Sequence, residues 1–520
     1  MRSTWRVTRP AASTGSGKPV SSSLTSQRDV VLSLDEGTTG ATAVAVSMDG
    51  QVRGNGYSEI TQHYPRPGWV EQDAEQIWSA VQVSARRALE AAGAKPGDVR
   101  AIGITNQRET LVAWDRKTLK PLTNAIVWQD RRTAGECTRL RAAGHEERVR
   151  DITGLVLDPY FTATKLAWVM KNVKGASGAA LGTVDSWLVA RLSAGRDHVT
   201  DASNASRTSL FDIGRGVWSE EMATLFGAPL ENLPEVRDSS GDISRSDPAA
   251  FLGIDAPISG IAGDQQAALF GQACTTVGMA KNTYGTGSFV LMQTGVQRVP
   301  SRTGMLTTVA WRRAGVLSYA LEGAIFITGA ALQWLRDGLR IIDSASEAGP
   351  LAASISDSGG VFLVPAFAGL GAPHWDAYAR GTIVGLTQGS GRAQIVRAAV
   401  EAMAYQTRDV VEAMEQDAGE PLRQLRVDGG AVVMDVLCQF QADLLGIPVR
   451  RPRQTETTAL GAAFLAGLGA GLWKDDDLAG LWKLDREFEP NMSRDQADSL
   501  QAEWRRAVER SRAWSLPDNQ

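Results

Sequence analysis

Two segments of the same kind, separated by half the chain, constrain the fold of this 520-residue protein most. In the first, an apolar run at 30–34 leads into Asp-Glu-Gly-Thr-Thr-Gly at 35–40 and then into a second apolar run at 41–48. In the other, residues 279–283 lead into Tyr-Gly-Thr-Gly-Ser at 284–288 and then into residues 289–293. Apolar runs joined by a Gly-rich turn are typical of β-hairpins. Their repetition predicts two related domains.

The remaining periodicity favours α/β layering in both halves. Short apolar runs predict strands, and longer amphipathic stretches predict helices between them. The predicted strands are 99–105, 124–127, 182–184, 361–365 and 423–427, and the predicted helices are 74–92, 131–142 and 394–415. We place the domain junction near 255–275, in a Gly-rich connection that carries Gly260, Gly263 and Gly271.

Residues 1–28 are predicted to be a disordered leader. They contain five basic residues and no acidic one among Ser, Thr, Gly and Pro, so they offer little apolar surface to bury. An untargeted extension is favoured over an organelle transit peptide, because no clear amphipathic helix emerges. The expected organisation is therefore a leader (1–28), an N-terminal domain (29–272) and a C-terminal domain (273–520).

Composition excludes several classes of function. With 54 Lys and Arg against 58 Asp and Glu, the chain has no basic excess for a nucleic-acid backbone. No apolar run approaches the ~20 residues of a bilayer crossing, so no membrane insertion is expected. Cys137, Cys274 and Cys438 lie far apart, which indicates neither a disulfide framework nor a zinc site and suits a reducing cytoplasm.

Several residues could carry chemistry, although each also has an ordinary structural interpretation. Asp35 is followed by two threonines in a Gly-rich turn that could hold Mg²⁺ and a phosphate tail. The turn Gly285–Gly287 could help to clamp a triphosphate, and the glycines that follow Asp428 would let a flat ligand approach the backbone. Such turns also occur as ordinary connections between the two strands of a β-hairpin, without any binding role. Asp264 is either a helix cap or a functional carboxylate, and Arg108-Glu109 is either a solvated surface pair or part of a site.

Longer strings resemble the glycerol kinases of the FGGY carbohydrate kinase family from about residue 30 to 510. The strings that carry this resemblance are HYPRPGWVEQD (63–73), GITNQRET (103–110), AIVWQDRRT (125–133), TGLVLDPYF (153–161), HVTDASNASRT (198–208), GIAGDQQAALFGQ (260–272) and KNTYGTG (281–287). Two signatures of the family also fit, YFTATKLAWVMKN (160–172) and GTIVGLTQGSGRAQIVRAAVE (381–401).

The resemblance implies an α/β fold of two ribonuclease H-like domains, of the actin and hexokinase type, with the active site in the interdomain cleft. It implies ATP-dependent phosphorylation of glycerol to sn-glycerol 3-phosphate, with Mg²⁺ and with Asp264 as general base. The implied polyol-binding residues are Arg108, Glu109, Trp128, Tyr160, Asp264, Gln265 and Phe289. The implied nucleotide and phosphate contacts are Thr38, Thr39, Thr286, Gly329, Gln333 and Gly430, and the implied metal carboxylates are Asp35 and Asp264. We also expect a cytoplasmic homo-oligomer, either a dimer or a tetramer.

Three residues depart from the family pattern inside this site. Glu36 stands where Gln is usual, Thr42 where Arg is usual, and Met434 where Asn commonly meets the nucleotide. The first two changes add negative charge and predict weaker ATP binding, unless both side chains point to solvent. The three departures leave room for a catalytically silent member that binds glycerol or a nucleotide. A kinase of another polyol or a ketose is the other alternative, and the set Arg108, Glu109, Tyr160 and Trp128 argues against it. A chaperone- or filament-type ATPase is disfavoured, because no sequence remains for a peptide-binding region.

Overall fold

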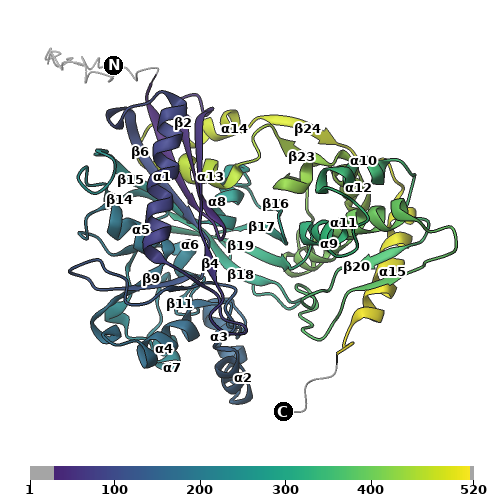
Figure 1. Cartoon of the computed structure of the whole chain (residues 1–520), viewed down its shortest axis with the longest axis horizontal. Coiled ribbons are helices and arrows are strands. Elements are labelled where there is room, and N and C mark those ends of the chain that lie inside the picture. Colours follow the sequence, from purple (N-terminus) through teal and green to yellow (C-terminus); the bar gives the residue numbers. More distant parts are fainter. Residues whose placement is uncertain (1–27, 516–520) are drawn as a thin grey trace, which may run out of the picture.

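The computed structural model describes residues 28–515, so the predicted leader lies outside it except for Arg28. Within this range, one mixed sheet of 13 strands runs through both halves of the chain. Figure 1 shows the N-terminal half, in purple to teal, beside the C-terminal half, in green and yellow. In spatial order the strands are β24 (Leu484–Phe488), β23 (Val449–Pro452), β22 (Gln424–Asp428), β16 (Met279–Tyr284), β17 (Ser288–Gly295), β19 (Val316–Ile325), β18 (Leu306–Arg313), β14 (Ser240–Arg245), β15 (Pro257–Gly263), β6 (Val99–Asn106), β1 (Val30–Glu36), β2 (Gly40–Ser47) and β3 (Val52–Glu59).

Both predicted hairpins are confirmed. Strands β1 and β2 pair antiparallel, as do β16 and β17. Each hairpin also has a parallel neighbour, β6 beside β1 and β22 beside β16. The two halves of the chain therefore begin with the same arrangement, a hairpin whose first strand runs parallel to a later one.

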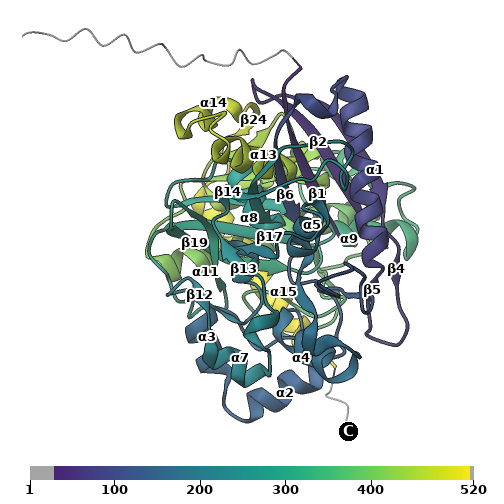
Figure 2. The same ribbon diagram turned by 90° about the vertical axis from the view of Figure 1, so that its left-hand side faces the viewer.

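Alternating side chains on β1 bury both faces of the N-terminal part of the sheet. Leu32 and Leu34 face a core formed with α1 (Ala74–Ala92) and α5 (Val184–Leu192), whereas Val31 faces α8 (Asp264–Gly271) and α13 (Thr457–Gly469). This is the period-two pattern of a strand that is covered on both sides. Figure 2 shows α1 and α13 on opposite sides of β1 and β2.

The expectation of a Gly-rich connection at 255–275 is wrong. These residues form β15 and α8, and α8 packs against α13. A Cβ on Gly271 would lie 2.0 Å from the carbonyl oxygen of Thr457, so the glycine permits the close approach of the two helices. Because α13 comes from the end of the chain and also packs on β1, β6 and β15, distant parts of the sequence share one core.

The C-terminal half builds its core around a long helix, α11 (Arg392–Ala418), which covers the predicted 394–415. The other helices there are α9 (Gly329–Asp337), α10 (Ala348–Ala353), α12 (Asp435–Leu445) and α15 (Arg494–Ser511), and β20 (Phe362–Val364) pairs with β21 (Thr382–Val384). The short helix α14 (Leu478–Leu481) packs instead on the core that contains α8 and α13. Among the helices of the described chain, none combines the length and apolar character needed to cross a membrane.

A second, smaller sheet lies in the lower part of the N-terminal half (Figure 1). Its strands are β4 (Gln62–His63), β5 (Glu71–Gln72), β8 (Ala125–Ile126), β7 (Leu111–Trp114) and β9 (Ala180–Thr183). The helices packed against it are α2 (Ala134–Ala142), α3 (Glu146–Thr153), α4 (Thr162–Asn172) and α7 (Glu220–Phe226). Nearby in the chain, β10 (Val199–Asp201) pairs with β13 (Glu235–Arg237) and β11 (Phe211–Asp212) pairs with β12 (Val217–Trp218). The short helix α6 (Ala202–Ala205) packs with β11 against β18 and β19 of the large sheet.

The three cysteines are free and buried in separate parts of the fold. Cys137 lies in α2, Cys274 follows α8, and Cys438 lies in α12. Burial raises the pKa of Cys137 to about 11 and those of Cys274 and Cys438 to about 12. At neutral pH the three side chains are therefore protonated thiols.

Candidate active site

Three neighbouring parallel strands deliver the predicted catalytic residues to one edge of the sheet. The register places Asn106, at the end of β6, opposite both Glu36 of β1 and Gly263 of β15. Because the carboxyl ends of parallel strands meet at the same edge, the residues that follow β6 and β15 lie close together there. The edge thus collects Asp35, Arg108, Glu109 and Asp264.

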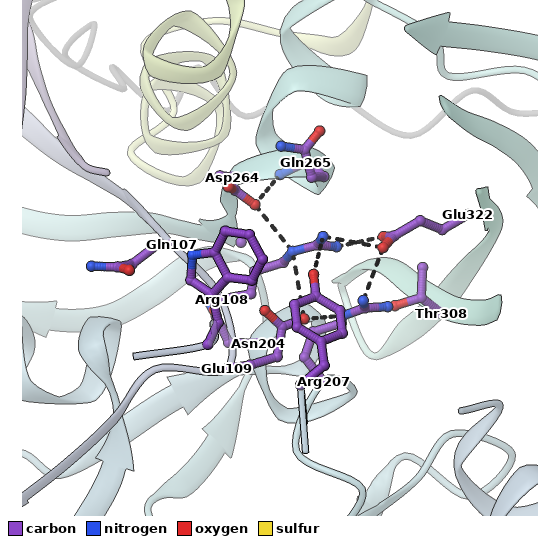
Figure 3. Close-up of polar contacts among 12 residues, drawn as sticks. Gln107, Arg108, Glu109, Asn204, Arg207, Asp264, Gln265, Thr308 and Glu322 are labelled. Atoms are coloured by element: carbon purple, nitrogen blue, oxygen red, sulfur yellow. Dashed lines mark hydrogen bonds and ion pairs between the residues drawn. The ribbon is translucent and has the colours of Figure 1, made fainter. Parts of the chain in front are cut away.

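Arg108 is the centre of the polar cluster at this edge (Figure 3). Its Nε lies 3.0 Å from Asp264 Oδ1, and its Nη2 donates to the Tyr160 hydroxyl at 3.3 Å. Arg108 and Glu109 are only 2% and 1% exposed, so the interpretation as a solvated surface pair is wrong. Glu109 has a φ of 62°, a strained backbone for a non-glycine residue and a feature that gathers at functional sites.

Trp128, Tyr160 and Phe289 come together around this cluster. The rings of Trp128 and Tyr160 meet edge to face with centroids 5.5 Å apart, and Phe289 lies 5.8 Å from the guanidinium carbon of Arg108. Trp128 Nε1 also donates to Thr38 Oγ1 at 2.9 Å. Aromatic faces beside paired polar groups can hold the C–H and O–H parts of a small polyol.

Asp264 is both the first residue of α8 and a member of the cluster. Its Oδ1 accepts the backbone N–H of Gln265 at 2.7 Å, as a helix-start carboxylate does. Its side chain keeps 31% of its surface exposed, unlike those of its neighbours Arg108 and Glu109. The carboxylate is therefore fixed in orientation and still open to a ligand.

Asp35 and Asp264 form a pair of carboxylates that suits a divalent cation. Burial raises the pKa of Asp35 well above its ordinary value, and the negative charges of Asp264 and Glu456 raise it further. A cation between the two aspartates would relieve this repulsion. Mg²⁺ commonly uses only one or two protein carboxylates together with water and substrate phosphates, so the residues present fit that ion.

Gln265 has a buried cationic partner that sequence analysis did not identify. Lys281 Nζ donates to Gln265 Oε1 and, at 2.8 Å, to Thr283 Oγ1. Burial lowers the pKa of Lys281 to about 8, although Asp428 and Asp264 oppose this shift. Lys281 therefore fixes the Gln265 amide through its Oε1 from the β16 side.

A cavity of about 640 Å³ opens beside the second hairpin. Four of the predicted nucleotide contacts line it, namely Thr286, Gly329, Gln333 and Gly430. Gly329 begins α9, and its N–H donates to the Gly285 carbonyl at 3.0 Å. A Cβ on Gly329 would lie only 2.5 Å from that carbonyl oxygen, so a larger residue would prevent this close approach. Thr38 and Thr39 lie on the first hairpin, among described residues outside this lining.

Comparison with known proteins identifies a family domain in each half of the chain. Residues 30–271 match the N-terminal domain of the FGGY family of carbohydrate kinases, and residues 280–470 match its C-terminal domain. The chain belongs to the FGGY family of carbohydrate kinases.

The relatives of this FGGY kinase cover almost its whole length. A glycerol kinase of Dechloromonas aromatica is 56% identical over 492 residues, which are 93% of this chain and 98% of the relative. A glycerol kinase of Deinococcus radiodurans is 54% identical over 94% of this chain and 99% of its own. The crystal structure of Plasmodium falciparum glycerol kinase with ADP superposes with a TM-score of 0.87 at 34% identity, over 93% of this chain and 98% of that one.

Two of the three departures from the family pattern now have a structural setting in this FGGY kinase. Glu36 is fully buried and its Oε1 accepts from Gln107 Nε2 at 3.0 Å, so the alternative that it points to solvent is wrong. Burial raises the pKa of Glu36 well above its ordinary value, against the opposing hydrogen bond from Gln107. Met434 lies in the cavity wall, where a Cβ on Gly349 would contact its Cγ at 3.1 Å.

Arg207 and Glu322 are the main members of the cluster that sequence analysis missed. Arg207 Nε donates to Glu109 Oε1 at 2.7 Å, and Glu322 accepts from both Arg108 and Arg207. A signal was present in the sequence, because Glu322 is a lone acid in the apolar run of β19. A charged residue at such a position is rarely buried unless it is paired.

Proposed function

We propose that this FGGY kinase transfers the terminal phosphoryl group of ATP directly to glycerol, giving sn-glycerol 3-phosphate. The observation that carries the proposal is the partly exposed Asp264 carboxylate, fixed by Arg108 beside a buried polar cluster and the rings of Trp128, Tyr160 and Phe289. The strong identity to glycerol kinases over nearly the full chain supports glycerol as the substrate.

Asp264 is the proposed general base for the attacking hydroxyl. A base must reach the proton that it accepts, and a carboxylate that is anchored yet open meets this requirement. Arg108, Glu109, Tyr160 and Gln265 then hold the other hydroxyls, and Trp128 and Phe289 cover the carbon chain. A triol with few atoms needs such paired donors and acceptors for recognition.

The phosphate side of the proposal uses both hairpins. Thr38 and Thr39 on the first hairpin and Thr286 on the second contact phosphates, and Gly329, Gln333 and Gly430 contact the rest of the nucleotide. Asp35 and Asp264 would hold Mg²⁺, which would supply positive charge to neutralise the phosphates. Phosphoryl transfer requires mainly alignment and neutralisation, so no covalent enzyme intermediate is needed. The cytoplasmic location and the homo-oligomer remain predictions from the sequence.

A coupled assay that follows ADP release tests the proposal directly. The purified protein is given ATP and Mg²⁺ with glycerol, dihydroxyacetone, erythritol or xylulose, and kcat/KM is measured for each. Glycerol should give the highest value. Preference for xylulose would assign the enzyme to another branch of the family, and binding of ligands without turnover would indicate a silent member.

A further inference from the structure

Glu322 lies in the polar cluster, although it comes from β19 of the C-terminal half. It is fully buried, and both of its carboxylate oxygens are engaged. Oε2 accepts from Arg108 Nη1 at 2.5 Å, and Oε1 accepts from Arg108 Nη2 at 3.1 Å and from Arg207 Nη2 at 2.9 Å. Figure 3 shows this one carboxylate facing both guanidinium groups.

These contacts extend into a chain of alternating charges that ends at the proposed general base. Arg207 bridges Glu322 and Glu109, and Arg108 bridges Glu322 and Asp264. Burial alone would raise the pKa of Glu322, but Arg108 and Arg207 outweigh it and bring this pKa to about 2. For Glu109, burial prevails over the same two arginines and raises the pKa. Glu322 is therefore the more firmly ionised of the two buried glutamates.

The other hydrogen bonds of the Arg108 Nη atoms are weaker than those to Glu322. The remaining hydrogen bonds of its Nη atoms, to Gln266 Oε1 and to the Tyr160 hydroxyl, are both 3.3 Å long. A paired carboxylate with short bonds to two nitrogens fixes the plane of a guanidinium far better than two long, neutral contacts. Without Glu322, Arg108 has only Asp264 and Glu109 as nearby ionic partners, and it would turn toward the base.

We propose that Glu322 is a positioning residue for polyol binding: from the C-terminal half it holds Arg108 and, through Arg207, Glu109 in the geometry that receives the substrate hydroxyls. This inference rests on the proposed function and adds to it a residue that need not touch the substrate. It makes glycerol affinity depend on a charged contact between the two halves of the chain.

The test compares Glu322→Gln with Glu401→Gln. Glu401 is also a buried acid of the C-terminal half paired with an arginine, since Arg397 Nε donates to its Oε1 at 2.6 Å, but its partner lies outside the polyol cluster. Initial rates over glycerol and ATP give separate KM values, and melting temperatures report folding. Glu322→Gln should raise KM for glycerol at least about tenfold and change KM for ATP less than about twofold, because its contacts lie at the polyol side. Glu401→Gln should leave KM for glycerol unchanged.

The outcomes separate this inference from the proposed function. No turnover of glycerol by the wild type would overturn both. An active wild type with an unchanged KM for glycerol in folded Glu322→Gln, or an equal loss for glycerol and ATP, would overturn the role of Glu322 alone. If Glu322→Gln fails to fold, the double variant Glu322→Gln, Arg207→Gln removes one charge of each sign. It should still show the raised KM for glycerol, and wild-type values in it would refute the inference.

Discussion

Asp264 is held by a main-chain hydrogen bond from Gln265 and by an ion pair with Arg108, so its shape matters apart from its charge. We predict that Asp264→Asn lowers kcat by about 10²- to 10⁴-fold, the usual contribution of a general base, because Asn keeps the shape but cannot accept the proton. Glycerol binding, measured by calorimetry, should change little. A variant that keeps more than about a tenth of the wild-type kcat would exclude Asp264 from this role.

Glu36 provides a residue-scale prediction about pH. Its pKa is raised from an ordinary value of 4.5, so the folded protein holds its proton more tightly than the unfolded chain does. Stability is therefore lost progressively as pH rises above this value, because the unfolded chain releases the proton first. Glu36→Gln removes this loss and keeps a side-chain oxygen for Gln107.

The measurement is the melting temperature of both proteins between about pH 5 and pH 8.5. The melting temperature of Glu36→Gln should rise relative to that of the wild type as the pH rises. The other buried carboxyls are present in both proteins, and of these Asp35 and Asp264 interact electrostatically with Glu36, so the difference reports Glu36 together with this coupling. A difference independent of pH, or one that shrinks at higher pH, would show that Glu36 is ionised in the folded protein. The same burial weakens the expectation that Glu36 adds negative charge beside ATP.

At the scale of the elements, the crossing of α8 and α13 links stability to catalysis. A Cβ on Gly461 of α13 would lie 1.8 Å from the Ala267 carbonyl oxygen of α8. Gly461→Ala should therefore force the helices apart, cost about 1–3 kcal/mol as overpacking does, and lower kcat because α8 begins at Asp264. Gly135→Ala on α2 is the control, because nothing lies within 4 Å of the added Cβ. It should leave kcat unchanged and should not lower the free energy of unfolding. Thermal unfolding and initial rates of the two variants decide the point.

Elements with a strong local pattern could be predicted from the sequence. The helix α1 matches its predicted residues because Asp73 caps its start, with Oδ1 accepting the N–H of Glu75, and Gly93 ends it at a φ of 63°. The sequence near 255–275 was misleading because two of its glycines, Gly260 and Gly271, permit close packing against α13, although glycines usually indicate a loop. Such a contact depends on residues about 200 positions later, and local periodicity carries no information about it.

The candidate site shows the same limit. The resemblance to the family placed Arg108 and Asp264 in one site, and the strand register explains why they meet. Glu322 was missed because its partner Arg108 is 214 residues away in the sequence. A lone acid in an apolar strand predicts a buried partner, but it does not identify that partner.

At the scale of the whole molecule, the two halves share a core as well as a sheet. Val31 and Ala101 from the N-terminal half pack in one cluster with Leu291, Ala320 and Phe464 from the C-terminal half. We therefore predict a single cooperative unfolding transition, seen at the same temperature by calorimetry and by circular dichroism. Two separated transitions would show that the halves are stabilised independently. Saturating glycerol should shift the whole transition upward, as a ligand bound only by the folded state does.

The three buried native thiols make local opening of the molecule measurable without the introduction of any new residue. A thiol reacts as its thiolate, so a side chain that is both covered and held neutral is silent until its surroundings open. Cys137 lies in α2, Cys274 directly follows α8, and Cys438 lies in α12, so each reports on a different region. The alkylation rate of each cysteine, measured separately by peptide mass, would report how often the native state opens locally at that position. Because α8 begins at Asp264 and Cys274 follows its end, a substrate that tightens the contact of α8 with α13 should slow the alkylation of Cys274 before that of the other two cysteines.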